Sequence, residues 1–178
     1  IFLESIGFWD KIDKYTEQIK YIRVHDRSEK NIIDFKNIKK KNSNLGYIVR
    51  NTIIKNLLLK EIKSKKNIQL IDNLTIKDIK KSDNFITLSS NKIKIITNLL
   101  IAADGKNSFV RQKLNTKIYK KEYKHKALVV NFNHTKNHNN FAYELFYNTG
   151  PLAILPMQSS KKNIFSSSVI WTNKPNHI

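Results

Sequence analysis

An apolar run that ends at an Asp-Gly pair is the feature that most constrains how this chain can fold. Residues 99–103 are all apolar, Asp104 and Gly105 follow, and apolar side chains return within residues 109–114. A short apolar run predicts a buried strand, the Asp-Gly pair predicts a tight turn, and the later spacing suits one face of a helix. We therefore expect a buried strand, a tight turn and the start of a helix.

The residue types at this turn allow two interpretations. Asp104 can accept hydrogen bonds from a ribose, Gly105 lets the backbone approach a ligand, and Arg111 can bind phosphate or hold the loop. Many α/β proteins bind a nucleotide with such an arrangement. A turn in which Asp104 only caps the helix would use the same residues, so the residues alone leave both interpretations open.

The charge of the chain is high, but it is carried almost entirely by lysine. The 178 residues have a net charge of +19, and 29 of the 33 basic residues are Lys while only 4 are Arg. Nucleic-acid interfaces favour Arg for its bidentate geometry, and these lysines are spread along a chain rich in Ile and Asn. We interpret the charge as compositional bias on solvated faces. An anionic partner such as a membrane surface or a nucleotide remains the alternative, and we do not expect nucleic acid.

Further composition limits the chemistry. The chain has no cysteine, which excludes disulfides and thiolate metal sites, and no apolar run of about 18 residues that would predict a transmembrane helix. His134 and His138 have a spacing that would suit a metal on a helix, but their tract is loop-like and has no carboxylate, so we expect no metal site. Tyr143 and Glu144 are adjacent on an expected strand and should point to opposite faces, which favours a structural role over acid-base catalysis.

The first two thirds of the chain predict an α/β arrangement. We expect one or two helices over residues 1–19, a helix after a capping Asn51 whose apolar face lies on a sheet, and a parallel sheet with a small antiparallel insert. The expected strands before the Asp-Gly turn cover 21–25 and 31–35, which can form a hairpin, then 68–71, 74–80, 84–89 and 92–96. Beyond residue 114 we expect a second, antiparallel sheet with strands at 127–132, 141–147, 152–155 and 164–172.

The Asp-Gly segment resembles the conserved motif of the FAD-dependent aromatic-ring monooxygenases, the para-hydroxybenzoate-hydroxylase-like group. Within that group the chain is most similar to the ubiquinone-biosynthesis hydroxylases. The matching stretches, in the family's order, are residues 3–12, 45–51 with the helix that follows, 101–111, 143–156 and 168–172. The resemblance therefore covers nearly the whole chain.

The resemblance implies a fold, a division of the chain and a set of site residues. The fold would be α/β, the middle part of a Rossmann-like FAD-binding domain interleaved with a mainly antiparallel substrate-binding sheet. Residues 1–44 and 115–178 would belong to the substrate side and 45–114 to the FAD side. The residues that would bind FAD or the NAD(P)H reductant are Asp104, Gly105, Arg111, Arg50 and Asn51, and those shaping the substrate pocket are Gly150, Pro151 and Pro156.

The resemblance also implies elements that are absent here. The family begins with a strand and Gly-x-Gly-x-x-Gly, and a later Gly-Asp motif holds the flavin ribose, yet this chain has only 4 glycines, at 7, 46, 105 and 150. We therefore expect an internal fragment that is inactive by itself.

The implied activity is hydroxylation of an aromatic ring, a polyprenylated phenol in ubiquinone biosynthesis, with FAD, NAD(P)H and O2. The protein would be cytoplasmic and bacterial, peripheral to the inner membrane or part of a ubiquinone-biosynthesis complex. The alternatives are a related FAD hydroxylase or reductase acting on another aromatic or isoprenoid substrate, and a basic binding module without catalysis. The sequence does not identify a side chain that would act directly in catalysis.

Overall fold

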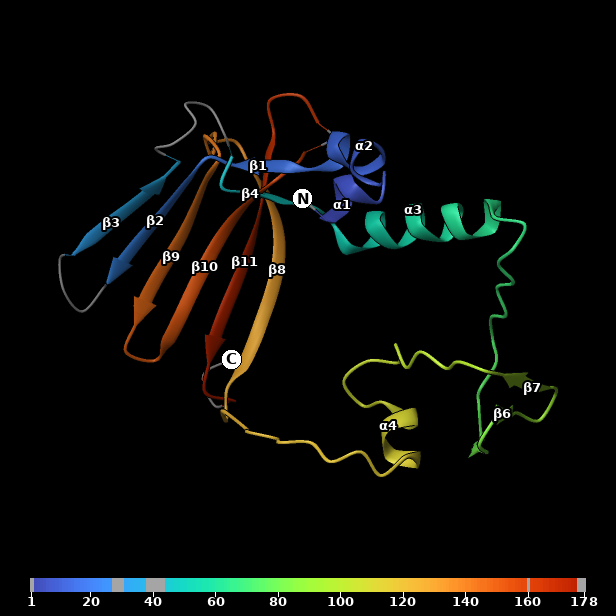
Figure 1. Cartoon of the computed structure of the whole chain (residues 1–178). Coiled ribbons are helices and arrows are strands. Elements are labelled where there is room, and N and C mark those ends of the chain that lie inside the picture. The colour runs from blue at the N-terminus through green and yellow to red at the C-terminus, as the bar shows by residue number, and fades with distance from the viewer. Residues whose placement is uncertain (1, 27–30, 38–43, 160, 176–178) are drawn as a thin grey trace. The chain divides into compact units, whose positions relative to one another are not determined.

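The computed structural model describes residues 2–26, 31–37, 44–159 and 161–175 (Figure 1). Two compact units form: unit 1 comprises Ile1–Lys65 with Tyr123–Ile178, and unit 2 comprises Lys66–Glu122. The chain is mixed α/β, with mainly strands and few helices. Among the described residues, no helix combines the length and the apolar character needed to cross a bilayer.

Unit 1 is built on a six-stranded sheet whose order is β3-β2-β9-β10-β11-β8 (Figure 1). Its strands are β2 (Tyr21–Asp26), β3 (Ile32–Lys36), β8 (Lys126–His134), β9 (Phe141–Tyr147), β10 (Gly150–Met157) and β11 (Phe165–Asn173). Strands β2 and β9 run parallel, and all other neighbours are antiparallel. The expected hairpin and the four expected strands beyond residue 114 are confirmed, because β-branched and aromatic runs alternate there with turn residues.

The N-terminal region of unit 1 forms two helices, one of the two arrangements expected over residues 1–19, but they end before residue 13. Helices α1 (Phe2–Ser5) and α2 (Trp9–Ile12) and the 3-10 turn η1 (Asp13–Tyr15) are short, and the chain then forms strand β1 (Glu17–Ile19), which pairs with β4 (Gly46–Ile48). Pairing with a distant segment overrides local helix propensity here. The small core lies at this end of the sheet, with Phe8, Ile12, Ile19, Ala142 and Met157 buried.

Helix α3 (Asn51–Ser64) confirms the predicted helix and corrects its start and its packing. Arg50, with extended backbone angles, occupies the N-cap position, and no side chain caps the helix, so the expectation that Asn51 caps it was wrong by one residue. None of the helix residues is buried. Its contacts within unit 1 include α2, where Lys11 and Glu61 form an ion pair, so the expected packing of its apolar face on a sheet is not observed.

Unit 2 contains a three-stranded antiparallel sheet of β5 (Asp78–Lys81), β6 (Ile86–Ser89) and β7 (Lys94–Thr97), followed by helix α4 (Phe109–Lys113). The antiparallel insert is therefore confirmed. The strands expected at 68–71 and 99–103 do not form among the described residues, and Leu99 and Ile101 are 72% and 78% exposed. An apolar run becomes a strand only where a neighbouring strand satisfies its backbone groups, and none pairs with these two in unit 2. For the same reason, the expected parallel sheet does not form among the described residues of unit 2.

Candidate functional site

The Asp-Gly turn of unit 2 forms as a compact, hydrogen-bonded turn before helix α4. Gly105 has a φ of +85°, a conformation that suits glycine. Asp104 Oδ2 accepts a hydrogen bond from the backbone N–H of Val110 at 3.2 Å, and the buried Ser108 is the N-cap, whose Oγ accepts from the N–H of Arg111 at 3.0 Å. Two side chains therefore satisfy free N–H groups at the start of α4. Asp104 acts as a cap, and its additional binding of a nucleotide stays a prediction.

The Asp104 carboxyl is held in its ionised form. The hydrogen bond from the Ser108 side chain, followed by backbone N–H groups that include that of Val110, lowers the pKa of Asp104 below its usual value despite an opposing effect of desolvation. Hydrogen bonds to the charged form favour it over the protonated form. The turn thus presents a fixed negative charge next to a sharp backbone bend.

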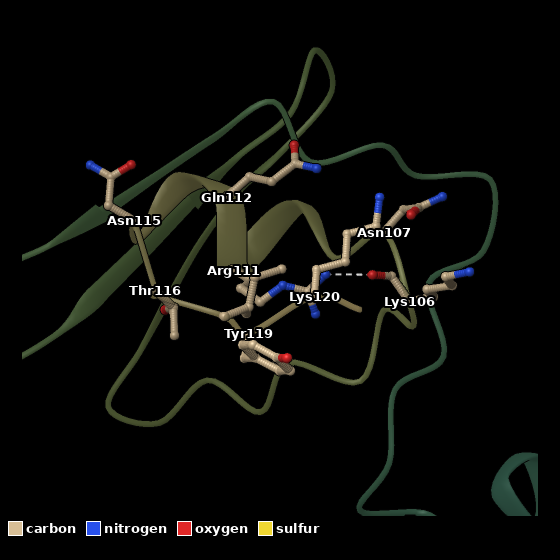
Figure 2. A pocket seen from close by; sticks show the side chains of 9 residues that line it. Lys106, Asn107, Arg111, Gln112, Asn115, Thr116, Tyr119 and Lys120 are labelled. Carbon is tan, nitrogen blue, oxygen red and sulfur yellow. Dashed lines mark hydrogen bonds between the residues drawn. The ribbon is translucent and has the colours of Figure 1, made fainter. Parts of the chain in front are cut away.

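Arg111 lies on α4 and is anchored to the same turn. Its Nη2 donates a hydrogen bond to the carbonyl oxygen of Lys106, which Figure 2 shows as a dashed line. The guanidinium thereby closes the loop between the turn and the helix. Its remaining N–H groups stay available to an acceptor, since guanidinium has five donors.

An open cleft of about 780 Å³ lies beside Arg111 (Figure 2). It is lined by three cationic side chains, three amides, a hydroxyl, a phenol and one apolar side chain, and by no carboxylate: Lys106, Arg111, Lys120, Asn107, Gln112, Asn115, Thr116, Tyr119 and Ile118. Lys120 already pairs with the carboxylate of Glu122 at 2.5 Å. Lys106, Arg111 and the amide donors form a set that suits phosphate groups. The residues present therefore fit the phosphate groups of an anionic ligand, a class that includes FAD.

Of the nine residues that line this cleft, only Arg111 was among the predicted cofactor-binding residues. Asn115, with a φ of 49°, ends α4 in a Schellman motif, in which the N–H of Thr116 bonds to the carbonyl of Arg111 at 3.1 Å and the N–H of Asn115 to that of Gln112 at 3.2 Å. This reversal places Tyr119 and Lys120 beside Arg111. An Asn directly after a helical segment was the available signal.

Arg50 and Asn51 belong to unit 1, at the start of α3. The Arg50 carbonyl accepts hydrogen bonds from the N–H groups of Ile53 at 2.9 Å and Ile54 at 3.3 Å. Its side chain lines a small pocket with Tyr15 from η1 and Gln158, which follows β10, while Asn51 is exposed. Their predicted contact with the flavin nucleotide stays a prediction.

The three predicted pocket residues, Gly150, Pro151 and Pro156, all lie on β10. Gly150 has a φ of +143°, and a Cβ there would lie 2.1 Å from the carbonyl oxygen of Thr172 on β11. Pro156 is fully buried, whereas Pro151 is half-buried. The close approach of β11 therefore explains why position 150 is a glycine, without any contact to a substrate. The predicted role of the three residues in a substrate pocket stays a prediction.

The two histidines considered as metal ligands lie at the end of β8 and in the turn after it. His134 Nε2 is 2.9 Å from Ser167 Oγ, and its Nδ1 is 2.6 Å from the carbonyl oxygen of Lys136, so both ring nitrogens already have partners. Over the described ranges, no group of three or more His, Cys, Asp or Glu residues is placed to hold a metal ion. Tyr143 and Glu144 lie next to each other on β9, where successive side chains alternate between faces.

Replacement of Ser108 by Ala tests the local role of this turn. We expect the variant to lose about 1 kcal/mol of stability, as is usual when an N-cap residue becomes Ala, and the pKa of Asp104 to rise towards its ordinary value. A Ser64→Ala variant, which removes an exposed hydroxyl near the end of α3, is the matched control and should change neither quantity appreciably. Chemical denaturation and NMR titration of the Asp104 carboxyl measure the two effects, and an unchanged Asp104 pKa would contradict the assignment.

Comparison with known proteins identifies the relatives of this chain. The profile of a family described as "FAD binding domain" matches residues 2–177. The ubiquinone hydroxylase UbiL of Rhodospirillum rubrum is 26% identical over 173 residues, which cover 97% of this chain and 39% of that protein. The mitochondrial ubiquinone biosynthesis monooxygenase COQ6 of Xenopus tropicalis is 28% identical over 188 residues, which cover 98% of this chain and 39% of that protein. The chain thus spans about two fifths of the length of these relatives.

Solved structures share the fold at low sequence identity. The crystal structure of CtdE in complex with FAD and a substrate has a TM-score of 0.70 and 13% identity, with 96% of this chain and 45% of that chain covered. The 2,6-dihydroxypyridine-3-hydroxylase from Arthrobacter nicotinovorans has a TM-score of 0.67 and 12% identity, with 98% and 45% covered.

Proposed function

Since this chain belongs to the FAD binding domain family, we propose that it is part of an FAD-dependent monooxygenase that hydroxylates an aromatic ring. The substrate we propose is a polyprenylated phenol of ubiquinone biosynthesis. The observation that carries the proposal is the family match over residues 2–177, and relatives named as ubiquinone hydroxylases support the choice of substrate. A related FAD hydroxylase acting on another aromatic or isoprenoid substrate is the alternative outcome.

The proposed cofactors are FAD and, as the reductant, NAD(P)H. When bound, FAD supplies the redox chemistry that uses O2 to hydroxylate the ring. The residues of this chain would bind and orient the cofactor. Arg111 and Lys106 of the cleft would neutralise phosphate charge, and the capped Asp104-Gly105 turn would hold the backbone in place for binding. Arg50 and Asn51 would contact the flavin nucleotide from the start of α3.

We propose that the chain contributes to two domains that interleave in sequence, as they do in the family. Residues 45–114 would belong to a Rossmann-like FAD domain, and residues 1–44 and 115–178 to the substrate side. The six-stranded sheet, with Gly150, Pro151 and Pro156 on β10, would then form one wall of the substrate pocket. A polyprenyl substrate and a net charge of +19 also favour peripheral association with an anionic membrane surface in a bacterial cell, alone or within a ubiquinone-biosynthesis complex.

The test uses the purified full-length protein. We expect flavin absorbance, oxidation of NAD(P)H that is stimulated by a prenylated phenol, and a product that has gained one oxygen atom from 18O2 by mass spectrometry. If the protein contains flavin but transfers oxygen only to another kind of aromatic compound, the result would support the alternative substrate. Salt-sensitive binding of nucleic acid without any flavin would reject the proposal in favour of a basic binding module.

A further inference from the structure

A carboxyl group lies in the middle of an apolar face of the large sheet in unit 1. Glu144 lies in the middle of β9, in register with Val24 on β2 and Ala153 on β10. Its neighbours along the same face of β9 are Ala142 and Phe146, because side chains two apart share a face. An ionisable group is therefore surrounded by apolar side chains on both flanking strands and along its own strand.

This carboxyl has no partner within the part of the chain that the structure describes. No hydrogen bond or ion pair to its oxygen atoms is present there, although the side chain is half-buried. Burial raises the pKa of Glu144 above its usual value, and no charged neighbour offsets this. A partly desolvated carboxyl without a partner costs free energy, so its retention in the middle of a strand needs a reason.

The opposite face of the same strands shows the contrast. There, Arg23 forms a bidentate pair with Asp34, with both distances at 2.7 Å. The Arg23 guanidinium also lies 5.5 Å from the ring centre of Phe141, on which Tyr21 stacks at 4.7 Å. On that face the charged groups pair with each other and the aromatic rings stack. The carboxyl of Glu144 has no such partner among the residues that the structure describes and is available to a hydrogen-bond donor of a ligand.

The face that carries Glu144 is also open. In the β2–β3 register Val24 pairs with Ile33 and Ile22 with Phe35, so these side chains continue the same apolar face, and Ile33, Phe35 and Phe146 are 56%, 50% and 46% exposed. The other carboxyl on this face, Asp26, lies at the end of β2 opposite Phe146. The face thus offers a broad apolar surface with one acceptor near its centre. A ligand that matches it is apolar with a single hydrogen-bond donor.

We propose that Glu144 is the hydrogen-bond acceptor for the ring hydroxyl of the phenolic substrate, whose hydrocarbon part lies on the apolar face around it. This inference rests on the proposed function, since a phenol with an apolar chain is the substrate class proposed there. The role is one of binding and selection, because an analogue without the hydroxyl would leave the carboxyl unpaired. Glu144 thereby favours phenols over the corresponding arenes.

The experiment compares para-propylphenol with propylbenzene, which lacks the hydroxyl, in calorimetric titrations of the full-length protein. We expect the wild type to bind the phenol about fivefold more tightly than the arene, and Glu144→Ala to bind both equally. Glu144→Gln, which keeps the shape and a weaker neutral acceptor, should show about a twofold preference. Asp26→Asn, which removes the other carboxyl of this face, should keep the wild-type preference.

The outcomes separate this inference from the proposed function. Equal binding of both probes by the wild type, or an unchanged preference in the Glu144 variants, overturns the role of Glu144. Absence of flavin or of a hydroxylated product rejects the proposed function, but a phenol preference that Glu144→Ala abolishes would still support the acceptor. Should Glu144→Ala not fold, as judged by its melting temperature, Glu144→Gln decides the question by the same ratio.

Discussion

Replacement of Gly150 by Ala is expected to destabilise the protein by about 3 kcal/mol. The new Cβ would lie 2.1 Å from the carbonyl oxygen of Thr172 and 3.0 Å from its carbonyl carbon, and both belong to the backbone of β11, so no side-chain rotation can relieve the overlap. The φ of +143° adds conformational strain for any residue with a Cβ. Overpacking and strain each cost roughly 1–3 kcal/mol, which gives the expected sum.

Gly46→Ala provides a matched control for this prediction. Its added Cβ would meet only Ile19 Cδ1, at the ordinary contact distance of 3.9 Å, and the backbone there is not in a left-handed conformation. We expect this variant to unfold close to the wild-type temperature, while Gly150→Ala unfolds roughly 10 °C lower. Thermal unfolding followed by circular dichroism measures both. A Gly150→Ala melting temperature within a degree or two of that of Gly46→Ala would show that β10 and β11 can separate here at little cost.

The strands of unit 1 were predictable because their sequences carry local signals. Alternation of apolar and polar residues and the turn residues between runs predicted β9, β10 and the hairpin of β2 and β3. The runs at 68–71 and 99–103 have equally good β-propensity, yet they do not form strands in unit 2. Strand formation depends on a partner elsewhere in the chain, and no local pattern reports whether that partner is present.

Helix boundaries and the cleft show a second limit of sequence patterns. Helix α3 was predicted from its apolar spacing, but its N-cap is Arg50 and not the predicted Asn51. The backbone conformation before a helix decides which residue is the N-cap, and the residue type alone does not report it. In unit 2 the Asp104 turn was predicted, whereas the side of the cleft formed by Tyr119 and Lys120 was not. That side depends on a left-handed Asn115, and the lysines that follow looked like compositional bias.

The second large effect concerns Asp104 in the full-length protein. We expect Asp104→Ala to weaken FAD binding at least tenfold, because the variant loses both the bond to the Val110 N–H and the ionised carboxylate at the turn. Hydrogen bonds to charged groups contribute about 1.5–3 kcal/mol, which corresponds to roughly 10- to 100-fold in affinity. Quenching of flavin fluorescence during titration of the apoprotein measures the dissociation constant.

Two further variants separate capping from cofactor binding at this turn. The side-chain oxygen of Asn can still accept the hydrogen bond from the Val110 N–H, so Asp104→Asn should keep the turn, and its effect on FAD binding then reports the carboxylate charge alone. Ser108→Ala removes a cap while it keeps that carboxylate, so it should lower stability with little change in FAD affinity. If Asp104→Ala and Asp104→Asn both bind FAD like the wild type, Asp104 is a helix cap and nothing more. Loss of affinity in Asp104→Asn without loss of stability would make the carboxylate itself a cofactor ligand.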